Sequence, residues 1–288
     1  MIDVLAIAGV AASLGATIPS VAEEGVGFDA SLYMSYAKIT GLYDADGKGQ
    51  KFGDGVNTNF MLLNLNASYN AWRLLPGLYA GLDLPVVTRT DASPGSDASN
   101  SGLGDVSFYA GYLAKVAETL RVGGQARLKL ATGKTEDLAG DEVPLGSGYT
   151  NLQLSALAAF EPMANLLVTG DVGYIVIMEK DDFNPGDTAY LDVGVGYRIA
   201  KFTPQLSVWY QNSGNAAEGG NTIDGSDTNA LSLGFDVFFA ATDTINAFVG
   251  LGTSTIPFGA NLNYGFPLLG KGQPSSGGSV HLGASGSF

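Results

Sequence analysis

The fold is indicated first by residues 60–70, whose sequence is FMLLNLNASYN. Apolar Met61, Leu63 and Leu65 alternate there with polar residues such as Asn64 and Asn66. Successive side chains of a β-strand point to opposite faces, whereas a helix, with roughly 3.6 residues per turn, would scatter the two sets around its circumference. The stretch therefore predicts a strand with one face toward lipid and the other toward a polar lumen.

The same alternation recurs along the chain. Apolar residues at even positions from 78 to 86 oppose Tyr79 and Asp83, and those from 122 to 130 oppose Arg127 and Lys129. The pattern predicts about twelve strands, at residues 28–40, 58–70, 78–87, 103–114, 121–133, 149–161, 166–178, 188–199, 203–211, 228–240, 245–254 and 279–288. We therefore expect an all-β fold, a transmembrane antiparallel up-and-down β-barrel of about 12 strands.

Every second predicted strand ends on an outward-facing aromatic residue just before a short connection. These aromatic residues are Tyr69, Tyr112, Phe160, Tyr197, Phe239 and Phe288. Aromatic rings are enriched where hydrocarbon meets the polar headgroups, so rings at one level in alternate strands indicate a membrane girdle. Phe288 is the last residue, and a terminal aromatic suggests a signal for the barrel-assembly machinery.

The connections alternate between short and long, which is typical of bacterial outer-membrane barrels. Short ones are expected at 71–77, 115–120, 162–165, 200–202 and 241–244, and long ones, rich in Gly, Asp, Asn and Ser, at 41–57, 88–102, 134–148, 179–187, 212–227 and 255–278. An even number of strands returns both termini to the same side. We expect localisation to the outer membrane of a Gram-negative cell, with both termini in the periplasm. The last long connection contains apolar residues such as Phe258 and Phe266, and we expect part of it to pack across the barrel mouth.

Composition supports this class. Hydrophobic residues make up 45% of the chain and charged residues 15%, yet beyond the N-terminus no apolar run reaches the roughly 18 residues of a spanning helix. The formal net charge of -14 makes nucleic acid an unsuitable partner. Gly accounts for 41 of 288 residues, and its many inward positions suggest either tight curvature of a small barrel or an open lumen. The chain has no cysteine, which excludes disulfides and thiolate metal sites.

Residues 1–22 resemble a secretory signal peptide, with an apolar stretch from Val4 to Leu14 and small residues before Glu23. The region before the apolar stretch lacks Lys and Arg and contains Asp3. Either the natural start lies upstream or the segment is retained, in which case an amphipathic or plugging helix is the alternative. The expected organisation is a signal peptide at 1–22, a short periplasmic N-terminus at 23–27 and the barrel at 28–288.

No pattern of residues indicates catalysis, a cofactor or a metal. Phosphate-binding loops, zinc-protease motifs and nucleophile elbows are absent from suitable contexts, and His281 is the single histidine. His281 faces the lumen by strand parity, so we interpret it as a structural or pore-lining residue rather than part of a Ser-His dyad. Asp44-Ala45-Asp46-Gly47 lacks most ligands of a calcium loop, and we interpret the acidic loops as solvated surface.

Charged residues at inward positions are the candidate pore-lining set. They include Arg121, Arg127, Lys129, Arg198, Asp83, Asp105, Asp171, Asp192 and Asp236, with His281 and with Asp29 and Glu161 elsewhere on the wall. Uncompensated charge in a narrow lumen is costly, so cross-strand ion pairs are expected. Arg121 with Glu161 and Lys129 with Asp105 are candidate pairs, because each pair lies at one height. Arg127 has no candidate partner at its own height, which makes it the residue most available to a passing solute.

Three short glycine-rich motifs resemble a known family. Gly102-Leu103-Gly104-Asp105-Val106 precedes Phe108 and Tyr109, Ala131-Thr132-Gly133-Lys134 is followed by an acidic loop, and Leu145-Gly146-Ser147-Gly148 leads into the strand that ends at Phe160. Together they resemble the outer-membrane transporters of the MetA pathway of phenol degradation, in which Pro-Thr-Gly is usual where this chain has Ala-Thr-Gly. The resemblance implies a small outer-membrane channel, often encoded with aromatic-compound catabolism, and brings no catalytic residue.

Two functions remain open at this stage. The first is a channel for passive diffusion of small molecules, with aromatic acids and other weakly polar compounds as candidate solutes. The second is a closed structural or surface-interaction barrel whose extracellular loops carry the function. Expected partners are outer-membrane lipid, small-molecule solutes and the barrel-assembly machinery, and an exposed apolar band is compatible with a homo-oligomer.

Overall fold

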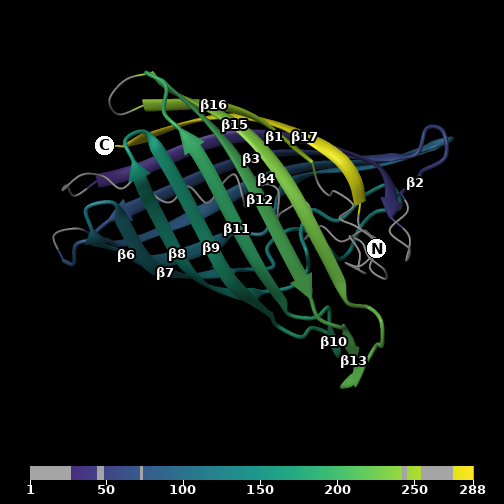
Figure 1. Ribbon diagram of the computed structural model, residues 1–288. Coiled ribbons are helices and arrows are strands. Elements are labelled where there is room, and N and C mark those ends of the chain that lie inside the picture. The colour runs from purple at the N-terminus through teal and green to yellow at the C-terminus, as the bar shows by residue number, and fades with distance from the viewer. Residues whose placement is uncertain (1–26, 44–48, 72–73, 242–244, 254–274, 288) are drawn as a thin grey trace.

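A closed antiparallel barrel forms the body of the protein in the computed structural model, which describes residues 27–43, 49–71, 74–241, 245–253 and 275–287 (Figure 1). Twelve strands close it. They are β1 (Gly27–Tyr43), β3 (Asn57–Asn70), β4 (Leu78–Ser93), β6 (Ser107–Ala117), β7 (Leu120–Lys129), β8 (Asn151–Met163), β9 (Leu166–Ile177), β11 (Thr188–Tyr197), β12 (Phe202–Ser213), β15 (Thr228–Ala240), β16 (Ile245–Thr253) and β17 (Ser275–Ser287). The predicted fold class is confirmed.

Closure is made by the first and last strands. β17 pairs with β1 antiparallel, and the register places Ser287 opposite Asp29 and Gly283 opposite Tyr33. Every other barrel strand pairs with its neighbour along the chain. An up-and-down barrel of this kind leaves no free edge, so its backbone polar groups are satisfied within the wall. In the described residues, no helix is long and apolar enough to cross a membrane.

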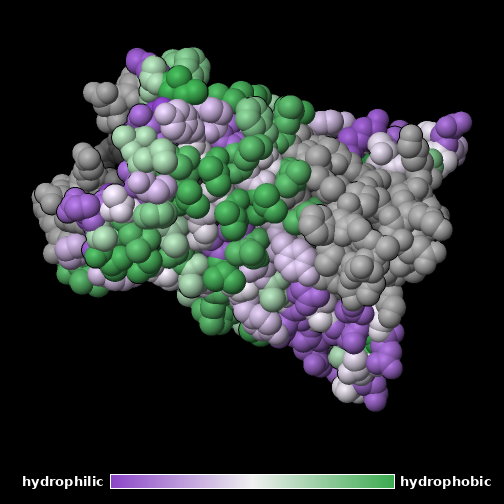
Figure 2. Space-filling view, in the orientation of Figure 1, coloured by the Kyte–Doolittle hydropathy of each residue, from purple (hydrophilic) through white to green (hydrophobic). Residues whose placement is uncertain are grey.

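Alternation sorts the side chains as the sequence predicts. On β3, Met61, Leu63 and Leu65 are exposed on the outer face, whereas Asn64 and Asn66 are buried on the inner face. Figure 2 shows the result as a field of hydrophobic side chains over the outer face of the strands, with hydrophilic residues gathered near β10 (Phe183–Asn184) and β13 (Ala217–Glu218). The molecule is therefore apolar outside and polar inside, the reverse of a water-soluble domain.

Tight turns lie at one end of the barrel and longer segments at the other. Only two residues separate β6 from β7 and β8 from β9 at the turn end, where β17 also finishes. At the opposite end, residues 130–150 and 214–227 form long connections, and β10, β13 and β14 (Asn221–Thr222) build a small separate sheet. The predicted alternation of short and long connections is present across the described residues.

The predicted loop at 88–102 is wrong, because these residues form a β-hairpin. β4 continues to Ser93 and pairs with β5 (Ser96–Leu103), and only Pro94 and Gly95 form the turn. Gly95 has φ +87°, a conformation that glycine adopts without strain. Small polar residues such as Ser99 and Ser101 weaken the hydrophobic signal of a strand, so the alternation that reveals the membrane-facing strands is absent here.

Several other boundaries shift. β7 ends at Lys129 rather than at 133, β17 begins at Ser275 rather than at 279, and β1 runs on to Tyr43 to pair with β2 (Gly49–Lys51). The predicted signal peptide at 1–22, most of the last long connection and Phe288 lie outside the described residues. The expectation that the last connection packs across the mouth therefore stays a prediction.

Candidate functional site: the barrel lumen

The inner face of β3, β4, β6 and β7 carries a half-buried ion pair. The strand registers place Asn66 opposite Asp83 and Tyr109 opposite Arg127. Arg127 Nη1 pairs with Asp83 Oδ2, and Asn66 Nδ2 donates a hydrogen bond to Asp83 Oδ1 over 2.7 Å. The Arg127 guanidinium also lies over the Tyr109 ring, 4.7 Å from its centroid, in a cation–π contact.

The prediction that Arg127 lacks a partner is therefore wrong. Asp83 belongs to β4, which is separated from β7 by β6, so a search among direct strand neighbours does not find it. The Arg127 side chain crosses β6 beside Tyr109 to reach the carboxylate. The long, planar guanidinium suits this distance and binds the ring and the carboxylate together. Arg127 is thus a member of a fixed wall network.

Tyrosine side chains pack together on the inner face beside this pair. Tyr79 is 2% exposed and packs against Tyr109, with ring centroids 6.3 Å apart. Gly81 lies under Tyr109, because a Cβ atom added to Gly81 would be 2.5 Å from the Tyr109 hydroxyl oxygen. Gly81 therefore does not serve to keep the lumen open. It makes room for a tyrosine from the neighbouring strand.

The inner face of β8, β9 and β11 is acidic and aromatic. Tyr190 donates its hydroxyl hydrogen bond to Asp171 Oδ1 over 3.0 Å, and Gln153 Nε2 donates to the Tyr190 hydroxyl over 2.6 Å. Asp192 stands directly opposite Asp171 in the register, and its Oδ1 atom is buried without a hydrogen-bond partner. Among the described residues, no Lys or Arg forms an ion pair with Asp171 or Asp192. Two carboxyl groups without an ion-pair partner thus face each other on this side of the lumen.

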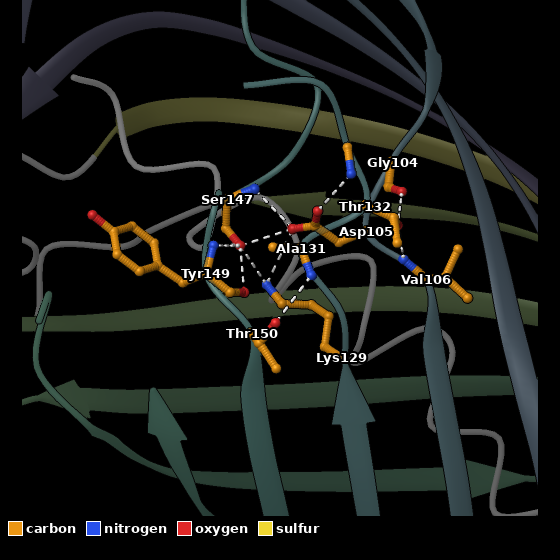
Figure 3. Close-up of polar contacts among 10 residues, drawn as sticks. Gly104, Asp105, Val106, Lys129, Ala131, Thr132, Ser147, Tyr149 and Thr150 are labelled. Atoms are coloured by element: carbon orange, nitrogen blue, oxygen red, sulfur yellow. Dashed lines mark hydrogen bonds and ion pairs between the residues drawn. The ribbon is translucent and has the colours of Figure 1, made fainter. Parts of the chain in front are cut away.

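A second polar cluster lies at the loop end of β6, β7 and β8, centred on Asp105 (Figure 3). The Asp105 carboxylate accepts hydrogen bonds from the Gly133 N–H over 3.0 Å, the Ser147 N–H over 2.7 Å and the Ser147 hydroxyl over 2.8 Å. Lys129 Nζ donates to Ser147 Oγ over 3.0 Å and lies 3.6 Å from Asp105 Oδ2. The predicted pair of Lys129 with Asp105 is confirmed. We call these four residues the Asp105 clasp.

Thr132 and two glycines complete the packing around the Asp105 clasp. Thr132 Oγ1 donates to the Gly104 carbonyl over 2.8 Å and accepts from the Val106 N–H over 2.9 Å, as Figure 3 shows. The backbones of Gly133 and Gly146 are in close contact, because a Cβ atom on Gly133 would lie 2.7 Å from the Gly146 Cα atom. The three glycine-rich motifs noted in the sequence therefore meet at one carboxylate.

The clasp fixes the ends of a long connection whose outer part has its own ion pairs. Lys134 Nζ donates to Glu142 Oε2 over 2.5 Å, and this hydrogen bond holds the pKa of Glu142 below its ordinary value. Lys180 pairs with Glu136 and so links this connection to the next one along the chain. These pairs are exposed to water and salt, so they add little to stability and mainly fix the loop conformation.

Other candidate pore-lining residues occupy different surroundings. Asp236 on β15 is buried at 2% exposure, and Arg121 on β7 is half-buried. The predicted pair of Arg121 with Glu161 is wrong, since these two described residues form no ion pair. An irregularity in the β8–β9 pairing begins after Phe160, and Glu161 beyond it is exposed.

Two further predictions concern the strand ends. Arg198 was expected on the inner wall, but β11 ends at Tyr197 and Arg198 is exposed, with its N–H bonded to the Asn165 carbonyl over 2.7 Å. The backbone of His281 pairs with Ser35 and Gly250, and its side chain lies outside what the structure describes. Of the aromatic residues expected in a girdle, Tyr69, Tyr112, Phe160 and Tyr197 are exposed at the turn end of their strands, and Phe239 packs against Phe202 with centroids 5.0 Å apart.

The chain shares its sequence pattern with one protein family. Residues 45–266, more than three quarters of the chain, match the family described as "Putative MetA-pathway of phenol degradation". The chain belongs to this family. The resemblance drawn from the three glycine-rich motifs is thereby confirmed, and each of those motifs contributes to the clasp that ties residues 130–150 to the wall. No curated protein sequence matches the chain.

Solved structures of outer-membrane proteins have the same fold as this chain. An outer membrane channel from Pseudomonas putida F1 is 14% identical with a TM-score of 0.69, and the match covers 93% of this chain and 97% of that one. The translocator domain of the autotransporter NalP from Neisseria meningitidis is 13% identical with a TM-score of 0.55, covering 99% and 97% of the two chains. At such identities the likeness concerns the barrel architecture alone.

Proposed function

We propose that this protein is an outer-membrane channel for the passive diffusion of small molecules, with aromatic and weakly polar catabolic substrates as its solutes. The observation that carries the proposal is a closed barrel with an apolar outer face and a lumen lined by polar and aromatic side chains. Membership of a family named for phenol degradation supports the solute class. No catalytic residue, cofactor or metal is assigned, and nucleic acid is not a partner.

The proposed placement in the membrane follows from the outer face. Tyr69, Tyr112, Phe160 and Tyr197, with Phe239 and Phe288, form the periplasmic girdle, and both termini lie in the periplasm. Residues 1–22 direct export, the barrel-assembly machinery inserts the chain, and outer-membrane lipid covers the exposed leucines and valines. Association into a homo-oligomer is compatible with this apolar band.

The lumen chemistry supports weakly polar aromatic solutes rather than strongly charged ones. Arg127 and Lys129 are paired with Asp83 and Asp105, so neither presents a free positive charge to an anion. Tyr79, Tyr109 and Tyr190 provide ring faces and edges against which another ring packs favourably. A solute with an aromatic body and one modest polar group matches this surface.

Burial in the lumen supports a second candidate, a closed barrel whose loops carry the function. Tyr79, Tyr109 and Leu157 are each less than 10% exposed, and together with Leu113 they form a packed cluster within the barrel. A lumen filled at this level stops a solute unless the tyrosine rings move. The channel therefore requires that these rings move aside as a solute passes, whereas the closed barrel does not.

Solute entry into liposomes separates the two candidates. Folded protein in liposomes is expected to admit phenyl glucoside faster than cyclohexyl glucoside, because the two neutral solutes are similar in size but only one has an aromatic ring that packs on the lumen tyrosines. Liposome swelling reports entry, and liposomes with heat-denatured protein are the control. If neither solute enters faster than in that control, the result favours the closed barrel.

A further inference from the structure

We infer that residues 143–147 set the size limit of the channel mouth and that Leu145 and Asp105 anchor this segment to the wall. This inference rests on the proposed channel function. It concerns residues 143–147, which we call the inner segment, and the wall formed by β4 and β5.

The inner segment lies against the lumen face of this wall. Leu103 on β5 is exposed on the outer face, so its neighbours Gly102 and Gly104 face inward. A Cβ atom on Gly102 would be 3.2 Å from Leu145 Cδ1, and one on Gly104 would be 3.5 Å from the Leu145 carbonyl oxygen. Leu145 is 4% exposed and packs against Gly102 and Gly104.

The approach to the inner segment is also bonded to β5. The Ser99 N–H donates to the Asp141 carbonyl over 2.8 Å, and Asn100 Nδ2 donates to the Val143 carbonyl over 3.1 Å. β5 lies along β4, so its other edge is occupied by this segment in place of a barrel strand. The connection therefore folds inward along β4 and β5 rather than outward into solvent.

Asp105 holds both ends of the connection that carries Leu145. Its carboxylate binds the backbone of Gly133 before the inner segment and that of Ser147 at its end. Hydrogen bonds to a charged acceptor are roughly twice as strong as neutral ones, and Lys129 offsets the charge of the carboxylate. The inner segment is thereby fixed against the wall, and the segment itself narrows the mouth at the height of Lys129.

A size series in liposomes tests this assignment. Leu145→Ala removes the apolar anchor of the inner segment and leaves the residues of the Asp105 clasp unchanged, so entry of the neutral solute naphthyl glucoside relative to methyl glucoside is expected to rise several-fold. Leu138→Ala is the matched control, because Leu138 is half-buried in the same connection outside the inner segment. Asp105→Ala is expected to raise the same ratio, and Asp105→Asn, which keeps one acceptor oxygen, to raise it less.

A double variant distinguishes positioning from general damage. If Asp105 and Leu145 hold the same segment in place, Asp105→Ala combined with Leu145→Ala gives the ratio of the larger single effect rather than the product of both. Heat-modifiable mobility on gels confirms that each variant is folded. A ratio unchanged in Leu145→Ala, or raised equally in Leu138→Ala, overturns the inference while the channel remains. If the wild-type protein admits neither solute, the proposed function fails, and the inference fails with it.

Discussion

Arg127→Ala is expected to lower the free energy of unfolding by about 1–3 kcal/mol, because it leaves a half-buried carboxylate without its counter-charge. The variant strands the Asp83 carboxylate, whose side chain is 15% exposed and which retains only its hydrogen bonds with Asn66 and Asn64. It also removes the cation over the Tyr109 ring. Urea unfolding in detergent micelles, followed by heat-modifiable mobility, measures the loss.

The control for this variant is an exposed pair. Lys115→Ala removes the partner of Glu118 at the β6–β7 turn, where water solvates both side chains, and little change is expected. Replacing both lumen partners, as Arg127→Met with Asp83→Leu, should recover much of the stability, because no buried charge is left alone. Equal losses from Arg127→Ala and Lys115→Ala would mean that the lumen pair is as well solvated as the surface pair.

Leu65→Arg is expected to destabilise the folded barrel in lipid by about 2–4 kcal/mol, since a charge on the lipid face is most costly near the bilayer midplane. Leu65 is exposed on the outer face of β3, four residues before Tyr69. Given the rise and tilt of barrel strands, it lies roughly 10 Å above the proposed girdle. Folding titrations in liposomes of defined thickness measure the effect.

The same substitution at two depths tests the placement of the girdle. Tyr69→Arg puts the same charge at the level where the side chain reaches the headgroups, and an arginine there costs only about 0–1 kcal/mol. We therefore expect the Leu65 variant to be clearly the less stable of the two. A larger loss at Tyr69 would move the bilayer toward the turn end of the barrel, and equal losses would contradict the proposed lipid boundary.

The barrel strands were predictable because lipid imposes a strict rule on one of their faces. On β3 from residue 61 to 69 and on β7, every outward position is apolar, aromatic or small, so the period of two is visible without structural information. The hairpin of β4 and β5 escaped prediction for the same reason. Its polar serines and asparagine show no such contrast, and only the turn at Gly95 marks it.

Contacts inside the lumen were harder to predict because strand parity tells which side chains face inward, not how far they reach. Lys129 and Asp105 lie at one height and near neighbouring strands, so their pair was found. Arg127 reaches across a whole strand to Asp83, which no rule about adjacent strands includes. The sequence places Tyr79 on an inward face and Tyr109 in a motif. It does not show that each ring covers a glycine of the neighbouring strand.

The Asp105 clasp shows that motifs far apart in the sequence can meet at one point of the structure. Ser147 is 42 residues from Asp105 in the chain. The glycine-rich motifs were noted for a family resemblance, and nothing in their sequence says that they meet. Their glycines are explained by the packing, because Gly133 and Gly146 are too close for side chains and a Cβ on Gly146 would strike the Asp105 carboxylate.

Single-channel recording in planar lipid bilayers tests the proposed channel most directly. We expect small, discrete conductance steps from heat-modifiable wild-type protein in symmetric KCl, because the packed tyrosines and the inner segment leave a narrow path. Steps should vanish when the protein is heat-denatured before addition. Folded protein that inserts in bilayers yet gives no steps at any voltage would contradict the channel and favour a closed barrel.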